Sequence, residues 1–187
     1  MRNLIWLMLL VAAPLFSQIP GREAPALIDE APSFVDEATV NAPVAAVWKV
    51  WTSSEGYKWL GVAQADVDFR IGGLIRSHYR ATGALGDEET IENRILAYEP
   101  RRMVAIRIER PPRSFPFKEA WKKSWTVITL TDTGNNRTHI RVASMGYGTD
   151  EESMTIRRFF EAGNASTLKA LQNHFDSGPA IQEETKR

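Results

Sequence analysis

The chain of 187 residues has no cysteine and only three histidines, at positions 78, 139 and 174. Without cysteine there is no disulfide framework, no thiolate nucleophile and no cysteine-ligated zinc or iron–sulfur site. Three scattered histidines do not predict a metal centre. The motifs G-x-S-x-G, H-E-x-x-H and G-x-x-x-x-G-K-[ST] are also missing, so nothing directly supports a serine hydrolase, a zinc protease or a P-loop protein. We therefore expect no metal and no cofactor.

Net charge is missing as well. Lys and Arg number 23, Asp and Glu also number 23, and the formal charge is zero. Without a net positive field the chain does not attract polyanions, so nucleic acid is not an expected partner. Hydrophobic residues make up 43% of the chain, which is ordinary for a globular protein with one compact core.

Residues 1–20 have the pattern of an export signal. Met1 to Asn3 carry one positive charge, and positions 4–16 (LIWLMLLVAAPLF) are uncharged and apolar. This run is shorter than the roughly 20 residues of a membrane-spanning helix. We therefore expect an exported protein, periplasmic or secreted, and the alternative is an anchor formed by an uncleaved N-terminal segment. Residues 21–33 are interpreted as a linker and the polar residues 176–187 as a disordered tail.

The remaining residues, 34–175, predict one α+β domain. Alternating polarity indicates a first strand at 34–40, and a short helix that Asn41 can cap follows, with an apolar face formed by Val44, Val47, Trp48 and Trp51. A second short helix spans 53–60. Six strand-like stretches follow at 62–70, 74–82, 88–98, 103–110, 121–131 and 138–147.

A long last helix, capped by Asp150, runs to about Phe175. The order of elements predicts a curved antiparallel sheet of about seven strands with this helix lying across it. The apolar stripe of the helix is interrupted at its middle by Gly163 and Thr167, where large side chains would fill a core. Two explanations stay open: a void that holds a ligand, or a gap filled by tryptophans at positions 48, 51, 121 or 125.

Several motifs, taken in this order, resemble those of one family. They are Ala42-Pro43 with Val47-Trp48 and Trp51-Thr52, then Trp59, Asp68-x-Arg70-x-Gly72-Gly73 and Tyr98-Glu99-Pro100. The chain resembles the heat-shock ATPase activator homologue branch of the START-like, or SRPBCC, superfamily. The resemblance implies the helix-grip fold with a deep pocket between helix and sheet, in a superfamily of small-molecule carriers and polyketide-cyclase-like proteins. One departure is Gly163-Asn164, where the family has Gly-Trp.

We predict that the protein binds a hydrophobic small molecule or a lipid in this pocket. Tyr79 and Asn93 lie on the apolar faces of their strands and would bring a phenol and an amide into it, whereas His78 lies on the opposite face and is expected to be solvated. The candidate ligand-binding residues are Trp48, Trp51, Trp59, Tyr79, Asn93, Trp121, Trp125, Phe160, Gly163, Asn164 and Thr167.

Two other functions stay open. A cyclase- or hydrolase-type enzyme could use Tyr79, Asn93 and His174 in the same pocket, although no acid–base pair stands out and no catalytic residue is assigned. Residues 110–123 are basic and contain Phe115 and Phe117, which suits a weak contact with a membrane surface or a protein–protein interface. The competing interpretation places both phenylalanine rings in the core. The sequence does not predict the oligomeric state.

Overall fold

The computed structural model describes residues 34–177. The predicted signal peptide and linker (1–33) and most of the predicted tail (178–187) lie outside this range. The described part forms one α+β domain, in the order that the sequence predicts. Its elements are β1 (Phe34–Val40), α1 (Val44–Thr52), α2 (Ser54–Lys58), β2 (Gln64–Val67), β3 (Leu74–His78), β4 (Ile91–Glu99), β5 (Met103–Arg110), η1 (Ala120–Lys123), β6 (Trp125–Asp132), β7 (Thr138–Met145) and α3 (Glu151–Asp176).

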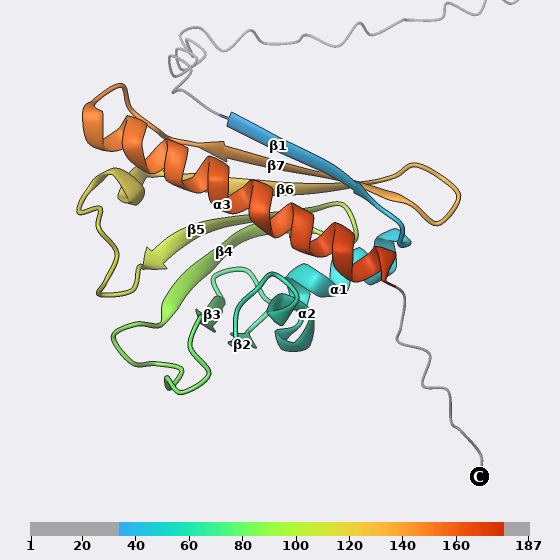
Figure 1. Cartoon of the computed structure of the whole chain (residues 1–187), viewed down its shortest axis with the longest axis horizontal. Coiled ribbons are helices and arrows are strands. Elements are labelled where there is room, and N and C mark those ends of the chain that lie inside the picture. Colours follow the sequence, from blue (N-terminus) through green and yellow to red (C-terminus); the bar gives the residue numbers. More distant parts are fainter. Residues whose placement is uncertain (1–33, 178–187) are drawn as a thin grey trace, which may run out of the picture.

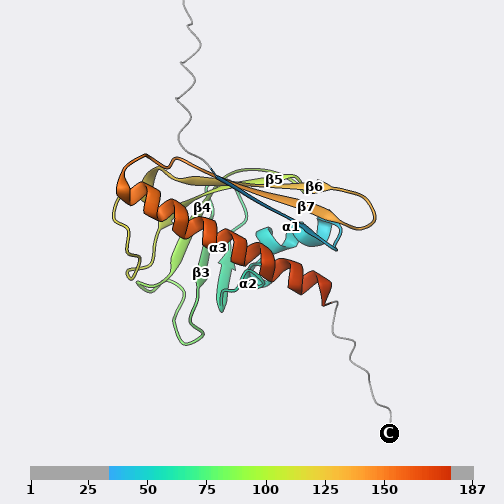
Figure 2. The same cartoon turned by 45° about the horizontal axis from the view of Figure 1, so that its top comes forward.

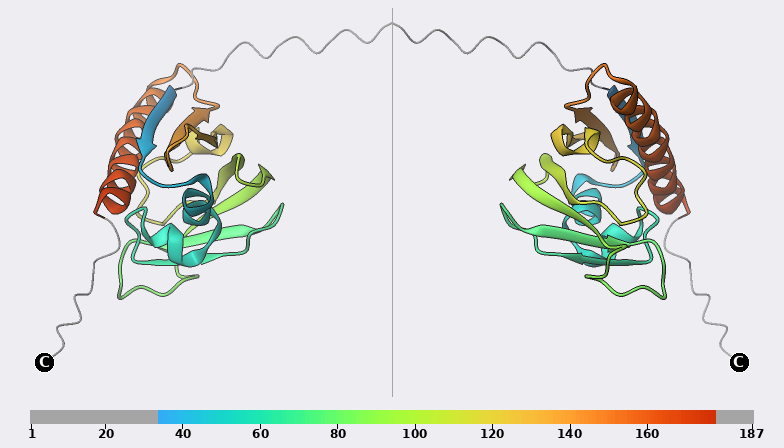
Figure 3. Two further views of the ribbon diagram at one scale, coloured as in Figure 1. Left: turned by 90° about the vertical axis from the view of Figure 1, so that its right-hand side faces the viewer. Right: turned by 90° about the vertical axis from the view of Figure 1, so that its left-hand side faces the viewer.

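The seven strands form one antiparallel sheet in the order β1-β7-β6-β5-β4-β3-β2. Strands β2 to β7 follow one another as a meander, and β1 extends the sheet by pairing with β7 from Phe34↔Ser144 to Val40↔Thr138. The sheet is curved, and α3 lies across it along β1 while α1 and α2 cover the end near β2 (Figures 1 and 2). Figure 3 shows α3 and β1 lying together on one side of the domain. This is the helix-grip fold, as predicted.

Side chains at the helix starts hold these elements in place. The Ser53 hydroxyl accepts a hydrogen bond from the Gly56 N–H (3.1 Å), and the Asp150 carboxylate accepts one from the Ser153 N–H (2.9 Å), so both cap their helices. The predicted cap at Asn41 is wrong, because α1 starts one residue after Pro43. The Asn41 amide instead donates to Asp176 Oδ1 (2.6 Å), which ties the start of α1 to the end of α3.

Three strands are at least three residues shorter than the sequence predicts. Strands β2 and β3 have four and five residues, because the chain turns at Gly72-Gly73 and leaves the sheet after His78. Strand β6 begins only at Trp125, since the preceding residues form the 3₁₀ turn η1. Trp121 therefore belongs to η1 and not to a strand.

His78 is buried, so the prediction that it is solvated is wrong. Its side chain packs beneath the connection between β3 and β4, and only 2% of the residue is exposed. Nδ1 accepts a hydrogen bond from the Arg80 N–H (2.9 Å), and Nε2 lies 3.4 Å from Asp87 Oδ2. Gly83 lies against the imidazole, where any Cβ would overlap the ring. Strand alternation does not show this, because the cover comes from the connection after the strand ends.

Candidate ligand-binding pocket

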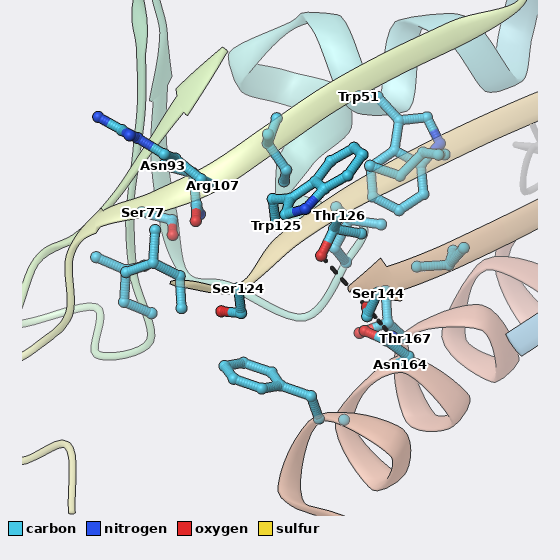
Figure 4. A pocket seen from close by; sticks show the side chains of 18 of the residues that line it. Trp51, Ser77, Asn93, Arg107, Ser124, Trp125, Thr126, Ser144, Asn164 and Thr167 are labelled. Atoms are coloured by element: carbon cyan, nitrogen blue, oxygen red, sulfur yellow. Dashed lines mark hydrogen bonds between the residues drawn. The ribbon is translucent and has the colours of Figure 1, made fainter. Parts of the chain in front are cut away.

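A cavity of about 270 Å³ lies between α3 and the sheet, with α1 and α2 closing one side (Figure 4). Every strand from β3 to β7 contributes side chains to its wall. The apolar part of the wall includes Leu60, Val62, Ile91, Ile106, Ile108, Ile128, Val142 and Leu168. For comparison, a dry cavity of about 150 Å³ accommodates benzene. The space therefore suits one or two rings and is too small for a lipid with two acyl chains.

Eight of the eleven predicted binding residues line this cavity. They are Trp51, Tyr79, Asn93, Trp125, Phe160, Gly163, Asn164 and Thr167. A Cβ built at Gly163 would meet no atom within 4 Å, so the gap in the apolar stripe of α3 faces open space. Of the two explanations for that gap, the structure supports the void. Contact of these eight residues with a ligand stays a prediction.

The other three tryptophans lie outside the cavity wall. Trp48 packs edge-on against Phe69, with ring centroids 5.6 Å apart. Trp59 stacks on His174 at 3.9 Å, and Trp121 packs beside the buried cluster of Phe34, Tyr147 and Ile156. Each indole thus fills a part of the core away from Gly163, which leaves the cavity unfilled.

Sequence reasoning did not assign several polar residues that line the cavity. They are Tyr57, Ser77, Ser124, Thr126, Ser144 and Tyr147. Ser77 and Ser144 stand on inward strand faces that are otherwise apolar, and each is only 2% exposed. A small polar residue that interrupts an inward apolar face is the signal that would have found them.

One polar group of the cavity comes from α2, β3 and β4. Burial raises the pKa of the Tyr57 hydroxyl to about 12, with the nearby Tyr79 acting in the same direction, and a hydrogen bond with the Asn93 side chain opposes both. Ser77 lies in the same part of the wall, and its hydroxyl makes no hydrogen bond to any residue in the range 34–177. We call Tyr57, Ser77 and Asn93 the Ser77 end of the cavity.

A second polar group comes from β6, β7 and α3. The Ser144 hydroxyl lies 3.3 Å from the Thr126 hydroxyl, and the Asn164 amide donates to it over 3.5 Å (Figure 4). We call Thr126, Ser144 and Asn164 the Ser144 end. Tyr147 lies next to this end, and burial raises the pKa of its hydroxyl to about 12. Hydrogen bonds with the side chains of Ser124 and Ser144 act in the opposite direction.

An acidic side chain stands behind the Ser144 end. Burial raises the pKa of the Asp36 carboxyl, and the negative charge of Glu161 raises it further. An interaction with the Asn164 side chain lowers the same pKa. Oδ2 of Asp36 is buried without a hydrogen-bond partner in the described part of the chain. Negative charge therefore gathers behind Asn164, outside the cavity wall.

The wall itself presents no free charge among residues 34–177. Its one charged residue is Arg107, whose Nη2 lies 3.3 Å from the Glu109 carboxylate, and Figure 4 shows its side chain extending away from the cavity. In the same range no three His, Asp or Glu side chains converge as a metal site requires, and no helix is long and apolar enough to cross a membrane. The cavity therefore suits an uncharged guest.

Exposed aromatic side chains form the rim of the cavity. Tyr79 is 67% exposed, Phe159 50% and Trp125 39%, and all three belong to the cavity lining. Phe115 and Phe117 pack against Phe159, with ring centroids 5.8 and 5.7 Å away. The structure thus agrees with the interpretation that these two phenylalanines complete the packing, here beside the cavity rim.

His174 is not part of the site. It lies in the last turn of α3, stacked on Trp59, and does not line the cavity. The enzyme alternative that combines His174 with Tyr79 and Asn93 therefore loses its histidine. The remaining two side chains provide a phenol and an amide but no general base.

Solved structures of other proteins share this fold. A protein of Mesorhizobium loti is 18% identical over 79% of this chain and 99% of that chain, with a TM-score of 0.62. A protein of Staphylococcus saprophyticus is 13% identical over 81% and 96%, with a TM-score of 0.60. An Aha1 dimer from Colwellia psychrerythraea is 14% identical over 75% and 96%, with a TM-score of 0.54. At such identities the likeness shows the fold alone.

Comparison with curated proteins finds no match. A family model, described as "Activator of Hsp90 ATPase homolog 1-like protein", matches residues 41–176, from the residue after β1 to the end of α3. The match covers well over half of the sequence and includes most of the elements that enclose the cavity. The chain therefore belongs to the family of Activator of Hsp90 ATPase homolog 1-like proteins, within the SRPBCC superfamily.

Proposed function

We propose that this protein binds a compact, uncharged hydrophobic molecule in the cavity between α3 and the sheet. The observation that carries the proposal is a cavity of about 270 Å³ which the core leaves unfilled and whose wall, among the described residues, has no unpaired charge. Ligand sites in proteins are concave and mostly apolar, with a few polar groups that fix the orientation of the ligand. The cavity has these properties.

The size of the cavity narrows the earlier prediction of a small molecule or a lipid. A mono- or bicyclic molecule suits the volume, whereas a phospholipid would have to leave most of its chains outside. The aromatic rim formed by Tyr79, Trp125 and Phe159 gives such a flat molecule an apolar approach from solvent. We therefore propose a carrier or sensor of small cyclic compounds.

Filling the cavity tests this proposal. Thr167 on α3 lines the cavity, so Thr167→Phe should occupy the space and lower the affinity for 2-naphthol, an uncharged bicyclic probe, at least about tenfold. Thr155→Phe is the matched control, because Thr155 is an exposed residue of the same helix and does not line the cavity. Equilibrium dialysis with chromatographic quantification of the probe measures both affinities.

Two results would contradict the proposal. Equal affinity of Thr167→Phe and the wild-type protein would place the probe outside the cavity. A wild-type protein that binds no member of a panel of uncharged mono- and bicyclic compounds, and that gives only the mass of the bare chain when extracted gently and examined by native mass spectrometry, would exclude a ligand-binding role for the cavity.

Two further expectations remain predictions. Export of the protein depends on residues 1–20, which lie outside the described range. Contact of residues 110–123 with an anionic membrane depends on free cations, and within this stretch Arg110 and Arg113 pair with Glu92 and Glu88, while Lys122 pairs with Glu119. Lys118 and Lys123 are exposed, have no ion pair within residues 34–177, and are the cations on which such a contact would depend.

A further inference from the structure

We infer that the cavity selects ligands that carry an uncharged hydrogen-bonding group at each of two opposite ends. One group would bind at the Ser77 end and the other at the Ser144 end. This inference rests on the proposed function and adds the chemistry of the ligand to it. Figure 4 shows Ser77 and Asn93 on one side of the cavity, Ser144, Asn164 and Thr167 on the other, and the indole of Trp125 between them.

The Ser77 end has an unused hydroxyl. Ser77 lines the cavity, and only 2% of the residue is exposed. Its hydroxyl has no hydrogen-bond partner within residues 34–177. This oxygen is not among the fully enclosed side-chain atoms that lack a partner in this range, so the hydroxyl faces the open space of the cavity. A group that enters the cavity can supply the missing partner. The Asn93 amide, beside it, has capacity beyond its one bond to Tyr57.

The Ser144 end is only loosely satisfied from within. The hydrogen bonds of the Ser144 hydroxyl with the Thr126 hydroxyl and the Asn164 amide are 3.3 and 3.5 Å long, near the upper limit for such bonds, and the Tyr147 hydroxyl adds a third interaction with Ser144. An amide has two donors and a two-lone-pair acceptor, so Asn164 keeps hydrogen-bonding capacity for a guest. A ligand hydroxyl or carbonyl placed here would shorten this network.

The surroundings of the two ends favour uncharged groups. The indole of Trp125 lies between them, and the rest of the wall includes the apolar side chains of Ile128 and Phe160. Behind the Ser144 end stand the carboxyl groups of Asp36 and Glu161, which would repel a ligand carboxylate. No cation of the wall faces inward to compensate, since Arg107 pairs with Glu109.

Three probes that differ only in hydroxyl groups test the inference. Naphthalene has none, 2-naphthol has one, and 2,6-dihydroxynaphthalene has one at each end. All three are uncharged at pH 7. Each added hydroxyl should raise the affinity of the wild-type protein about three- to tenfold, the range expected for a hydrogen bond to an otherwise unpaired group. Equilibrium dialysis measures the three affinities.

Variants of the two serines show which end of the cavity is responsible for each gain in affinity. Ser77→Ala and Ser144→Ala should each lower the affinity for 2,6-dihydroxynaphthalene to about that of 2-naphthol, and should leave naphthalene unchanged. The double variant should bind all three probes alike. Ser166→Ala is the matched control, because Ser166 is an exposed residue of α3 that does not line the cavity, so the wild-type order of affinities should persist.

The outcomes separate this inference from the proposed function. If naphthalene binds and the hydroxyls add nothing, the two-ended selection is wrong and the cavity still binds ligands. The same conclusion follows if Ser166→Ala erases the increments as fully as the two variants at the ends. If none of the three probes binds the wild-type protein, the proposed function fails together with the inference. Circular dichroism establishes that each variant is folded.

Discussion

Gly163 shows what a single residue contributes to this fold. Glycine lowers helix stability by about 1 kcal/mol relative to alanine, yet it stands in the middle of α3. A Cβ at this position would meet no atom within 4 Å. We therefore predict that Gly163→Ala raises the free energy of unfolding by up to about 1 kcal/mol. Urea unfolding measures the change, and a loss of stability would mean that α3 lies closer to the sheet than the structure shows.

The identity of residue 164 matters for the site in another way. Where the resemblance to the family implies tryptophan, this chain has an asparagine whose amide reaches Ser144. A large apolar ring at this point would fill space and supply no hydrogen-bond acceptor. The departure thus accounts for both the volume and the polarity of the Ser144 end.

The connection between β3 and β4 behaves as a folded element although it has no regular structure. It covers His78, and the Thr90 hydroxyl, Asp87 and the backbone of Ala84 and Gly86 are joined by hydrogen bonds within it. Gly83 lies against the imidazole of His78. We predict that Gly83→Ala lowers the free energy of unfolding by about 1–3 kcal/mol, because the added methyl group must push the ring or the backbone aside.

Gly163→Ala is the natural control for this prediction. The chemical change is the same, but at position 163 the space is open. Urea unfolding of both variants should therefore show changes of opposite sign. If Gly83→Ala were as stable as the wild-type protein, the connection would not pack on His78 as described.

Elements with strong local signals were predictable from the sequence. The strand at 34–40 and the strand at 103–110 have the predicted bounds, and α3 follows its cap at Asp150 and ends one residue beyond the expected point. These features depend on alternation, helical spacing and capping, which act within a few residues. The burial of His78 and the short strand β3 depend instead on residues 79–90, which the periodicity of β3 does not contain.

The site was predictable only where it depends on local spacing within one element. The gap in the stripe of α3 left a void as one of two explanations, and the open space lies beside Gly163 and Thr167. The fate of each tryptophan was not predictable, because it depends on which distant ring is the neighbour: Phe69 for Trp48 and His174 for Trp59. Tyr57 escaped notice because its partner Asn93 is 36 positions away.

On the scale of the whole molecule, two buried tyrosines stand at the two ends of the cavity. Tyr57 belongs to α2 beside the Ser77 end, and Tyr147 follows β7 beside the Ser144 end. Both are less than 10% exposed. Neither hydroxyl can ionise easily while α3 and the sheet enclose the cavity, so their ionisation reports on the closure of the entire fold.

This arrangement predicts a loss of stability at alkaline pH. Burial raises the pKa of Tyr57 and of Tyr147 from 10.0 to about 12 in the folded protein. Above pH 10 the unfolded chain releases these two protons while the folded protein retains them, so the unfolded state is favoured increasingly as the pH rises. Each tyrosine should lower the free energy of unfolding by up to about 2–3 kcal/mol between pH 10 and pH 12, and leave it unchanged below that window.

Urea unfolding at pH 9, 10.5 and 11.5 measures this loss, and the absorbance of tyrosinate at 295 nm shows whether ionisation accompanies unfolding. Tyr57→Phe should make the decline shallower, because one of the two raised groups is removed. Tyr79→Phe should have a smaller effect in the same direction, since Tyr79 is exposed at the rim and only adds to the raised pKa of Tyr57. A tyrosinate signal that develops fully while the protein is still folded would mean that solvent reaches both phenols through the cavity, and that α3 and the sheet open far more readily than their packing implies.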